Sequence, residues 1–203
     1  MVQKKKPEIR DAILAAASAL FRERGYANAT MSAIARRANT SPANIYVYFN
    51  SKLEILLAVY EPWLRDRIER LAARAETVTE PELRIRLMLR TLWKELPADD
   101  NHFARNLVQA LSGVPRDGGE AAALRRWCEA RLGEMLHDAL PEERRQGEKT
   151  AALGHPVLST FDGCTLQGES GASTERIDEA AELFAMLLMG RHGTAGPGRK
   201  QAG

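Results

Sequence analysis

The run from Thr30 to Lys52, TMSAIARRANTSPANIYVYFNSK, carries the side chains of this chain that are best suited to contact an anion. It combines hydroxyl groups, two tyrosine phenols, two arginines and a lysine. Ser51 and Glu54 form an S-x-x-E capping box, which predicts a helix that begins beside Lys52. The free N–H groups in a first helical turn favour anions. The chemistry that these residues favour is therefore the binding of anionic oxygens.

A short helix and a turn must position the first half of this run. Thr30 is a suitable N-cap, and one apolar face follows it at helical spacing, formed by Met31, Ile34, Ala35 and Ala38. Asn39 and Thr40 then interrupt the pattern. Asparagine enters the left-handed region of backbone space more readily than most residues, so we expect a tight turn here.

A second short helix is expected to start directly after this turn. Ser41 is a good N-cap, Pro42 suits the first helical position, and Ile45 and Phe49 give a buried side. The residues left to face outward are Ser41, Pro42, Ala43, Asn44, Tyr46, Val47 and Tyr48. Two short helices joined by a tight turn have the shape of an element that reads DNA.

Residues 8 to 57 resemble the N-terminal domain of the TetR family of transcriptional regulators. The residues that carry the match, in order and spacing, are Leu20 to Tyr26, Thr30, Ile34-Ala35, Ala38, Ile45-Tyr46, Tyr48-Phe49 and Ser51-Lys52. The chain departs from the family pattern at the turn, where Asn39 and Thr40 replace a glycine and a hydrophobic residue. The resemblance implies an all-α fold, with a three-helix DNA-binding domain containing the helix-turn-helix and a larger helical-bundle domain for dimerisation and effector binding.

By this resemblance, the residues that bind DNA phosphates are Thr30, Tyr46, Tyr48 and Lys52. A hydroxyl at a helix start, two phenols and a cation at a helix N-terminus all suit phosphate oxygens. The alternative for Tyr46 is that its ring packs beneath the turn. Arg36 and Arg37 are either further phosphate ligands or a solvated helix face.

Base reading is expected from the outward side of the second helix and from the first helix, through Ser32, Ser41, Pro42, Ala43, Asn44 and Val47. Asn44 is the natural adenine reader, because its amide offers both a donor and an acceptor. The alternative is that this amide is solvated or caps its own helix.

The charge distribution agrees with a DNA-binding N-terminus. Residues 1–52 contain nine cationic and three anionic side chains, which is a net charge of +6, and the rest of the 203-residue chain carries −4. A basic end on a mildly acidic body is expected when one end meets a polyphosphate.

We expect three segments: a DNA-binding domain over residues 1–52, a helical domain over 53–190, and a disordered tail over 191–203. The helices are predicted at 7–24, 52–77, 80–96, 101–112, 118–140 and 174–190, with a less regular stretch at 141–168. Gly25 is the expected C-cap of the first helix. Pro62 is expected to bend the long helix without ending it, because the apolar pattern resumes beyond the proline.

A homodimer through about residues 141–190 is the expected assembly, and it implies a palindromic operator. The apolar residues that suggest this interface are Leu153, Val157, Leu158, Phe161, Ile177, Ala181, Phe184, Leu187 and Leu188. The alternative is that this stripe serves only the core of one subunit. By analogy with the family, we expect the protein to act as a repressor that a small apolar effector releases.

An effector pocket is expected in the second domain, lined by Trp63, Met88, Trp93, His102, Phe103, Leu107, Trp127 and Phe161. For each aromatic residue taken singly, core packing is the favoured alternative. Arg90, His102 or His155 could provide the polar contact of this pocket.

Two other classes of function compete with a regulator. A metal-binding enzyme could use Glu134 and His137, or the turn residues Asp99, Asp100 and His102, but no second Glu-x-x-His pair and no nucleophile motif accompanies them. A redox switch could use the two cysteines, Cys128 and Cys164. We expect no catalytic residue, metal or cofactor, no membrane-spanning segment, and a cytoplasmic location.

Overall fold

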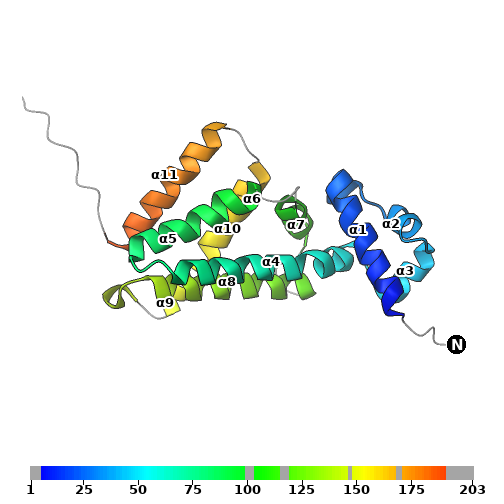
Figure 1. Cartoon of the computed structure of the whole chain (residues 1–203), viewed down its shortest axis with the longest axis horizontal. Helices are drawn as coiled ribbons and strands as arrows, with labels where there is room; N and C mark the ends of the chain where they lie inside the picture. The colour runs from blue at the N-terminus through cyan, green and yellow to red at the C-terminus, as the bar shows by residue number, and fades with distance from the viewer. Residues whose placement is uncertain (1–5, 99–102, 115–118, 146–147, 168–170, 191–203) are drawn as a thin grey trace, which may run out of the picture.

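The computed structural model describes residues 6–98, 103–114, 119–145, 148–167 and 171–190. These residues form helices and no strand, so the all-α prediction is confirmed. Figure 1 shows a small group of helices at one end and a larger bundle at the other. The helices of the small group are α1 (Pro7–Asn28), α2 (Met31–Arg37) and α3 (Pro42–Tyr48).

One long helix, α4 (Lys52–Glu76), connects the small group with the bundle. Its N-cap Ser51 accepts a hydrogen bond of 3.0 Å from the backbone N–H of Glu54, which confirms the predicted start. Pro62 lies inside the helix, and the helix continues past it as predicted. Because α4 belongs to both parts, a change in its tilt would move the small group relative to the bundle.

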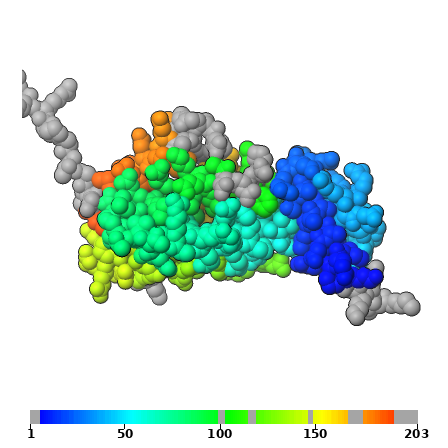
Figure 2. Space-filling model, in the orientation of Figure 1, coloured from blue at the N-terminus to red at the C-terminus, as the bar shows by residue number. Residues whose placement is uncertain are grey.

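The bundle is built from α5 (Pro81–Arg90), α7 (Phe103–Ser112), α8 (Gly119–Ala139), α10 (Gly154–Gln167) and α11 (Gly171–Leu188). Helices α5, α7 and α8 pack against α4, whereas α10 packs against α7 and α8, and α11 packs against α5. Its core is continuous with that of the small group, because buried residues of α1, α4 and α7 belong to one apolar cluster. In Figure 2 the small group forms a distinct projection at one end of the molecule.

The helix predicted at 80–96 is instead three pieces. After α5 the chain widens into a π-helical turn, η1 (Thr91–Glu95), followed by the short α6 (Leu96–Ala98). Pro97 has no N–H and its ring clashes with the carbonyl group four residues earlier in a regular helix, which is a physical reason for the widened turn. Residues 99–102 and the predicted tail 191–203 lie outside the described part.

The segment 141–168 is also broken, into η2 (Glu142–Arg144), α9 (Glu148–Ala151) and α10. Gly154 shows why α10 starts where it does: a Cβ atom at this residue would lie 1.8 Å from the carbonyl oxygen of Glu129 on α8. Only glycine allows the two backbones to approach this closely. The last helix starts at Gly171, so Thr174 lies inside it and is not its cap as predicted.

The apolar stripe that we assigned to a dimer interface mostly serves the core of one subunit. Val157, Leu158 and Phe161 are buried, and Ala181 is fully buried in α11. Phe184 packs edge-on against Trp93, with 5.7 Å between ring centroids. The exposed large apolar residues of α10 and α11 are Leu166, Leu183 and Leu187, of which only Leu187 belonged to the predicted stripe.

None of the helices in the described ranges is long and apolar enough to cross a membrane.

Candidate nucleic-acid interface

The two helices of the predicted helix-turn-helix begin at the predicted caps. The Thr30 Oγ1 atom accepts a hydrogen bond from the N–H of Ala33 at 3.1 Å, and the Ser41 Oγ atom accepts one from the N–H of Asn44 at 3.1 Å. Asn39, in the turn, has a φ of 51°, as predicted for the left-handed region. Local contacts therefore define where α2, the turn and α3 begin and end.

The start of α3 presents an exposed face. Ser41, Pro42 and Ala43 are exposed, and Tyr46 is 54% exposed, so its ring does not pack beneath the turn. Val47 is half-buried, and Ser32 on α2 is exposed. Small side chains at a helix start, followed by a projecting phenol, leave space for a nucleic-acid backbone to approach.

Tyr48 does not point outward as expected; it is only 8% exposed. It lies three residues after Ile45 and therefore shares the buried face of α3. Its hydroxyl oxygen accepts a hydrogen bond of 2.9 Å from the backbone N–H of Lys6. This bond ties the segment before α1 to the end of α3, and a phosphate contact by Tyr48 stays a prediction.

Asn44 is turned back toward the turn. Its Nδ2 atom donates a hydrogen bond of 2.7 Å to the Thr40 hydroxyl, while its Oδ1 atom is buried without a partner among the described residues. A contact with adenine would have to replace the bond to Thr40. Base reading by Asn44, Ser32, Ser41, Pro42, Ala43 and Val47 stays a prediction.

Lys52 fastens the end of α1 to the start of α4. Its Nζ atom donates hydrogen bonds to the carbonyl oxygens of Tyr26 at 2.7 Å and Ala27 at 3.4 Å, and it lies 4.2 Å from the centroid of the Tyr26 ring. A cation at a helix C-terminus interacts favourably with the helix dipole. Burial lowers the pKa of Lys52. Phosphate contacts by Lys52, Thr30 and Tyr46 stay a prediction.

The arginines of α2 differ in their surroundings. Arg37 forms an ion pair of 2.6 Å with Glu23 of α1, and the Arg37 hydrogen bond lowers the pKa of Glu23. Arg36 is exposed and has no ion pair within the described ranges. Of the two, Arg37 would have to exchange an ion pair for a phosphate, and a phosphate contact by either arginine stays a prediction.

Asn106 of α7 joins the small group to the bundle, and we did not predict this contact. Helix α1 breaks at Gly25, where φ is 76°. The Asn106 side chain accepts the N–H of Tyr26 at 2.8 Å and donates to the carbonyl oxygen of Phe21 at 2.9 Å and to the Tyr60 hydroxyl at 3.3 Å. One amide thus satisfies backbone groups on both sides of the break.

The eight residues of the predicted effector pocket occupy several places in the bundle. Leu107 and Phe161 line a cavity of about 20 Å³, which is room for little more than one water molecule. Trp63 and Phe103 pack together at 5.4 Å between ring centroids. Three more do not line this cavity: Met88 is buried, Trp93 donates its indole N–H to the Val157 carbonyl oxygen, and Trp127 lies beneath Arg65. His102 lies outside the described residues.

The residues of the competing functions are also placed. In the described ranges, no three His, Cys, Asp or Glu side chains come together as metal ligands, and Asp99, Asp100 and His102 lie outside them. Glu134 forms an ion pair of 3.4 Å with Arg131. Cys128 is buried and Cys164 half-buried, and both are free thiols.

Sequence comparison finds relatives of the helix-turn-helix region and of most of the chain. Residues 13–59 match the family of bacterial regulatory proteins described as the tetR family. An uncharacterized HTH-type transcriptional regulator of Mycobacterium tuberculosis is 28% identical over 180 residues, which cover 88% of this chain and 79% of that protein.

Two solved structures share the fold. A TetR-family transcriptional regulator from Pectobacterium atrosepticum has a TM-score of 0.70 at 23% identity, covering 91% of this chain and 97% of the other. AibR, in complex with isovaleryl coenzyme A and operator DNA, has a TM-score of 0.60 at 17% identity, covering 89% and 98%. The similarity therefore extends over both the small group and the bundle.

Proposed function

Because this chain belongs to the TetR family of transcriptional regulators, we propose that it binds a palindromic operator as a homodimer and represses transcription until a small-molecule effector releases it. The observation that carries the proposal is the exposed start of α3, which Ser41 caps and which is followed in the same helix by the exposed Tyr46. A helix presented in this way can enter the major groove, whereas a buried one cannot.

In the proposed complex, α3 lies in the major groove with Pro42, Ala43 and Val47 against base edges. The Thr30 hydroxyl and Tyr46 phenol bind phosphates on either side, and Arg36 adds a cation. The N–H groups at the start of α4, next to Lys52, supply a further anion site. Phosphate contacts fix the register of the helix, and the groove contacts select the sequence.

A dimer places two such helices on one face of the duplex. We propose that α10 and α11, within residues 141–190, form its interface, because Leu166, Leu183 and Leu187 are 42%, 59% and 64% exposed. These side chains project away from the bundle core, and a second copy would cover them. A twofold interface uses the same patch on both subunits, so the operator repeats its half-site in inverted order.

Effector control requires a ligand that binds the DNA-free arrangement more tightly than the DNA-bound one. The structure of AibR with both isovaleryl coenzyme A and operator DNA supports the presence of both activities in this fold. In the present chain, Asn106 and α4 are the physical links by which a change in the bundle could reach α1 and α3.

The experiment that tests the proposal is selection of bound duplexes from a random pool by the full-length chain, followed by sedimentation of the complex with the selected duplex. The expected result is one enriched inverted repeat bound by two subunits. Enrichment of no sequence, or of an unrepeated site bound by one subunit, would contradict the homodimeric regulator. If the Ala43→Glu variant binds the enriched site with the same affinity as the wild type, the proposed role of α3 is contradicted.

A further inference from the structure

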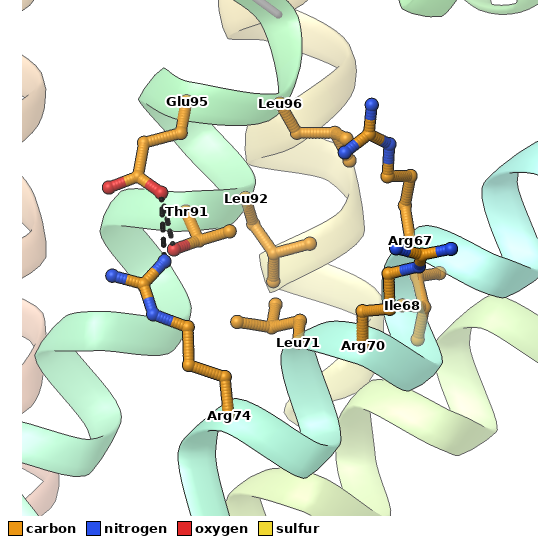
Figure 3. Close-up of a pocket in the computed structure, with 9 residues that line it drawn as sticks. All are labelled: Arg67, Ile68, Arg70, Leu71, Arg74, Thr91, Leu92, Glu95 and Leu96. Carbon is orange, nitrogen blue, oxygen red and sulfur yellow. Dashed lines mark hydrogen bonds and ion pairs between the residues drawn. The ribbon is translucent and has the colours of Figure 1, made fainter.

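We infer that a groove between α4 and the π-helical turn η1 binds a small organic anion that carries an apolar portion. Figure 3 shows this groove: Arg74 lies beside Thr91 and Glu95 on one side, Arg67 and Arg70 lie on the other, and Leu71 and Leu92 lie between them. Its volume is about 230 Å³. The lining residues are Arg67, Ile68, Arg70, Leu71, Arg74, Thr91, Leu92, Glu95 and Leu96.

The floor of the groove is apolar. Ile68 and Leu71 of α4 meet Leu92 and Leu96 from the opposite wall, and all four are buried. In Figure 3 the side chains of Leu71 and Leu92 face each other at the centre. A ligand with a hydrocarbon portion would therefore remove apolar surface from water, which favours binding by about 25 cal/mol per Å².

The rim of the groove is cationic. Arg67, Arg70 and Arg74 stand on successive turns of α4, and Glu95 is the one carboxylate among the lining residues. The lining residues alone therefore carry a net formal charge of +2, and Asp66, which pairs with Arg70, lies outside the lining. Guanidinium groups bind carboxylates and phosphates through paired N–H donors, so an anion is the complementary head group.

The ion pairs of Arg70 and Arg74 are weak enough to be displaced. Arg74 contacts Glu95 at 3.4 Å, and Arg70 contacts Asp66 at 2.8 Å, with all four side chains about half exposed or more. Exposed ion pairs of this kind contribute at most about 1 kcal/mol. An anion in the groove could therefore engage Arg74 and Arg70 at small cost, and Glu95 would keep its 2.9 Å hydrogen bond from Thr91.

The wall that faces the arginines is itself unusual. Residues 91–95 form a π-helical turn, which is rare and occurs often at functional sites. Thr91, Leu92 and Glu95 of this turn line the groove. The volume is smaller than the roughly 300–1,000 Å³ of pockets for drug-sized ligands, so the ligand is small.

This site is distinct from the aromatic effector pocket predicted from the sequence, and none of those eight residues lines it. Its binding activity does not depend on the proposed operator binding. Failure to bind DNA would leave this inference intact.

The test is isothermal titration of the full-length chain at 0.15 M salt with octanoate, octyl phosphate, octanol and octylammonium. We expect both anions to bind and the neutral and cationic compounds to bind at least tenfold more weakly. The ratio of the two anions shows whether the groove prefers a carboxylate or a phosphate. Acetate should also bind at least tenfold more weakly than octanoate, because it lacks the apolar portion.

Matched variants locate the site. Arg70→Gln and Arg74→Gln should each weaken octanoate or octyl phosphate binding about tenfold, as expected for loss of a charged hydrogen bond. Arg126→Gln, a change at an exposed arginine of α8, should leave binding unchanged. The inference is overturned if neither anion binds, if octanol binds as tightly as the anions, or if Arg126→Gln has the same effect as Arg74→Gln.

Discussion

Replacing Asn106 with alanine tests whether one buried amide holds the DNA-reading end to the bundle. The side chain is 2% exposed and makes three hydrogen bonds, to Tyr26, Phe21 and Tyr60. Its removal leaves the N–H of Tyr26 without the Asn106 acceptor and takes one buried donor from the carbonyl group of Phe21. Each unsatisfied buried group costs about 1–3 kcal/mol, so the free energy of unfolding should fall by about 2–4 kcal/mol.

The assay is urea unfolding at one fixed subunit concentration, with Asn28→Ala as the matched control. Asn28 is also an asparagine near the end of α1, but it is exposed and its Nδ2 atom donates only to the Arg24 carbonyl oxygen, at 3.0 Å. That change should cost less than about 0.5 kcal/mol. Asn106→Asp adds a second comparison, because it keeps the acceptor for Tyr26 and loses the donor to Phe21.

The same variants measure coupling to DNA. At urea-free conditions where Asn106→Ala remains folded, its affinity for the selected duplex should fall, because the break in α1 is no longer fixed against α7. An Asn106→Ala variant as stable as Asn28→Ala would refute the role of the amide in stability. A destabilised variant with unchanged DNA affinity would refute its role in positioning the reading helices.

Two further predictions concern the bundle. Gly154→Ala should destabilise the protein by about 1–3 kcal/mol or more, because its Cβ atom would meet the Glu129 carbonyl oxygen at 1.8 Å. The control is Gly163→Ala in the same helix, whose Cβ atom meets nothing within 4 Å, so this change should be neutral or stabilising. Equal urea midpoints for the two variants would contradict the close approach of α10 to α8. Burial raises the pKa of the Cys128 thiol to about 12. In the Cys164→Ala variant, where Cys128 is the remaining thiol, a disulfide reagent at pH 8 should therefore modify Cys128 only as fast as the protein unfolds. Rapid modification of that variant would contradict the burial of Cys128. The folded-state pKa of Cys128 exceeds the ordinary value of 9.0, so the contribution of the neutral thiol to the free energy of unfolding is complete below pH 9. Above pH 9 the free energy of unfolding should fall by about 1.4 kcal/mol per pH unit. The Cys128→Ala variant should lack this slope.

Features set by neighbouring residues could be predicted from the sequence. The caps Thr30, Ser41 and Ser51 and the left-handed Asn39 depend on contacts within a few residues, and each was found where the pattern placed it. Continuation of α4 through Pro62 followed from the apolar pattern beyond the proline. Local chemistry therefore defined the helix-turn-helix correctly.

Features set by distant residues could not be predicted in this way. Tyr48 bonds to Lys6, 42 residues away, and Asn106 bonds to Phe21, 85 residues away. No spacing rule links such pairs, and an asparagine beside apolar residues in α7 carries no signal of its own. The π-helical turn and the arginine-lined groove likewise depend on how α4 meets η1, which only the folded bundle determines.

The roles of Asn44 and Lys52 show the same limit at the interface itself. Both residues have the chemistry that DNA recognition needs, yet in the structure each bonds within the small group, to Thr40 and to the end of α1. Their residue types indicated polar contacts but did not specify the partner. Binding to DNA would have to exchange or share these hydrogen bonds.

The central claim is that the exposed start of α3 contacts DNA, and fluorescence anisotropy with the selected duplex tests it most directly. Wild type should bind with a slope of log affinity against log salt of about −4 or steeper, as expected if a dimer neutralises two or more phosphates per subunit. Ala43→Glu should weaken binding at least about tenfold, whereas Ala130→Glu, at an exposed position of α8, should not. Equal affinities for the two variants, or a slope near zero, would contradict the account.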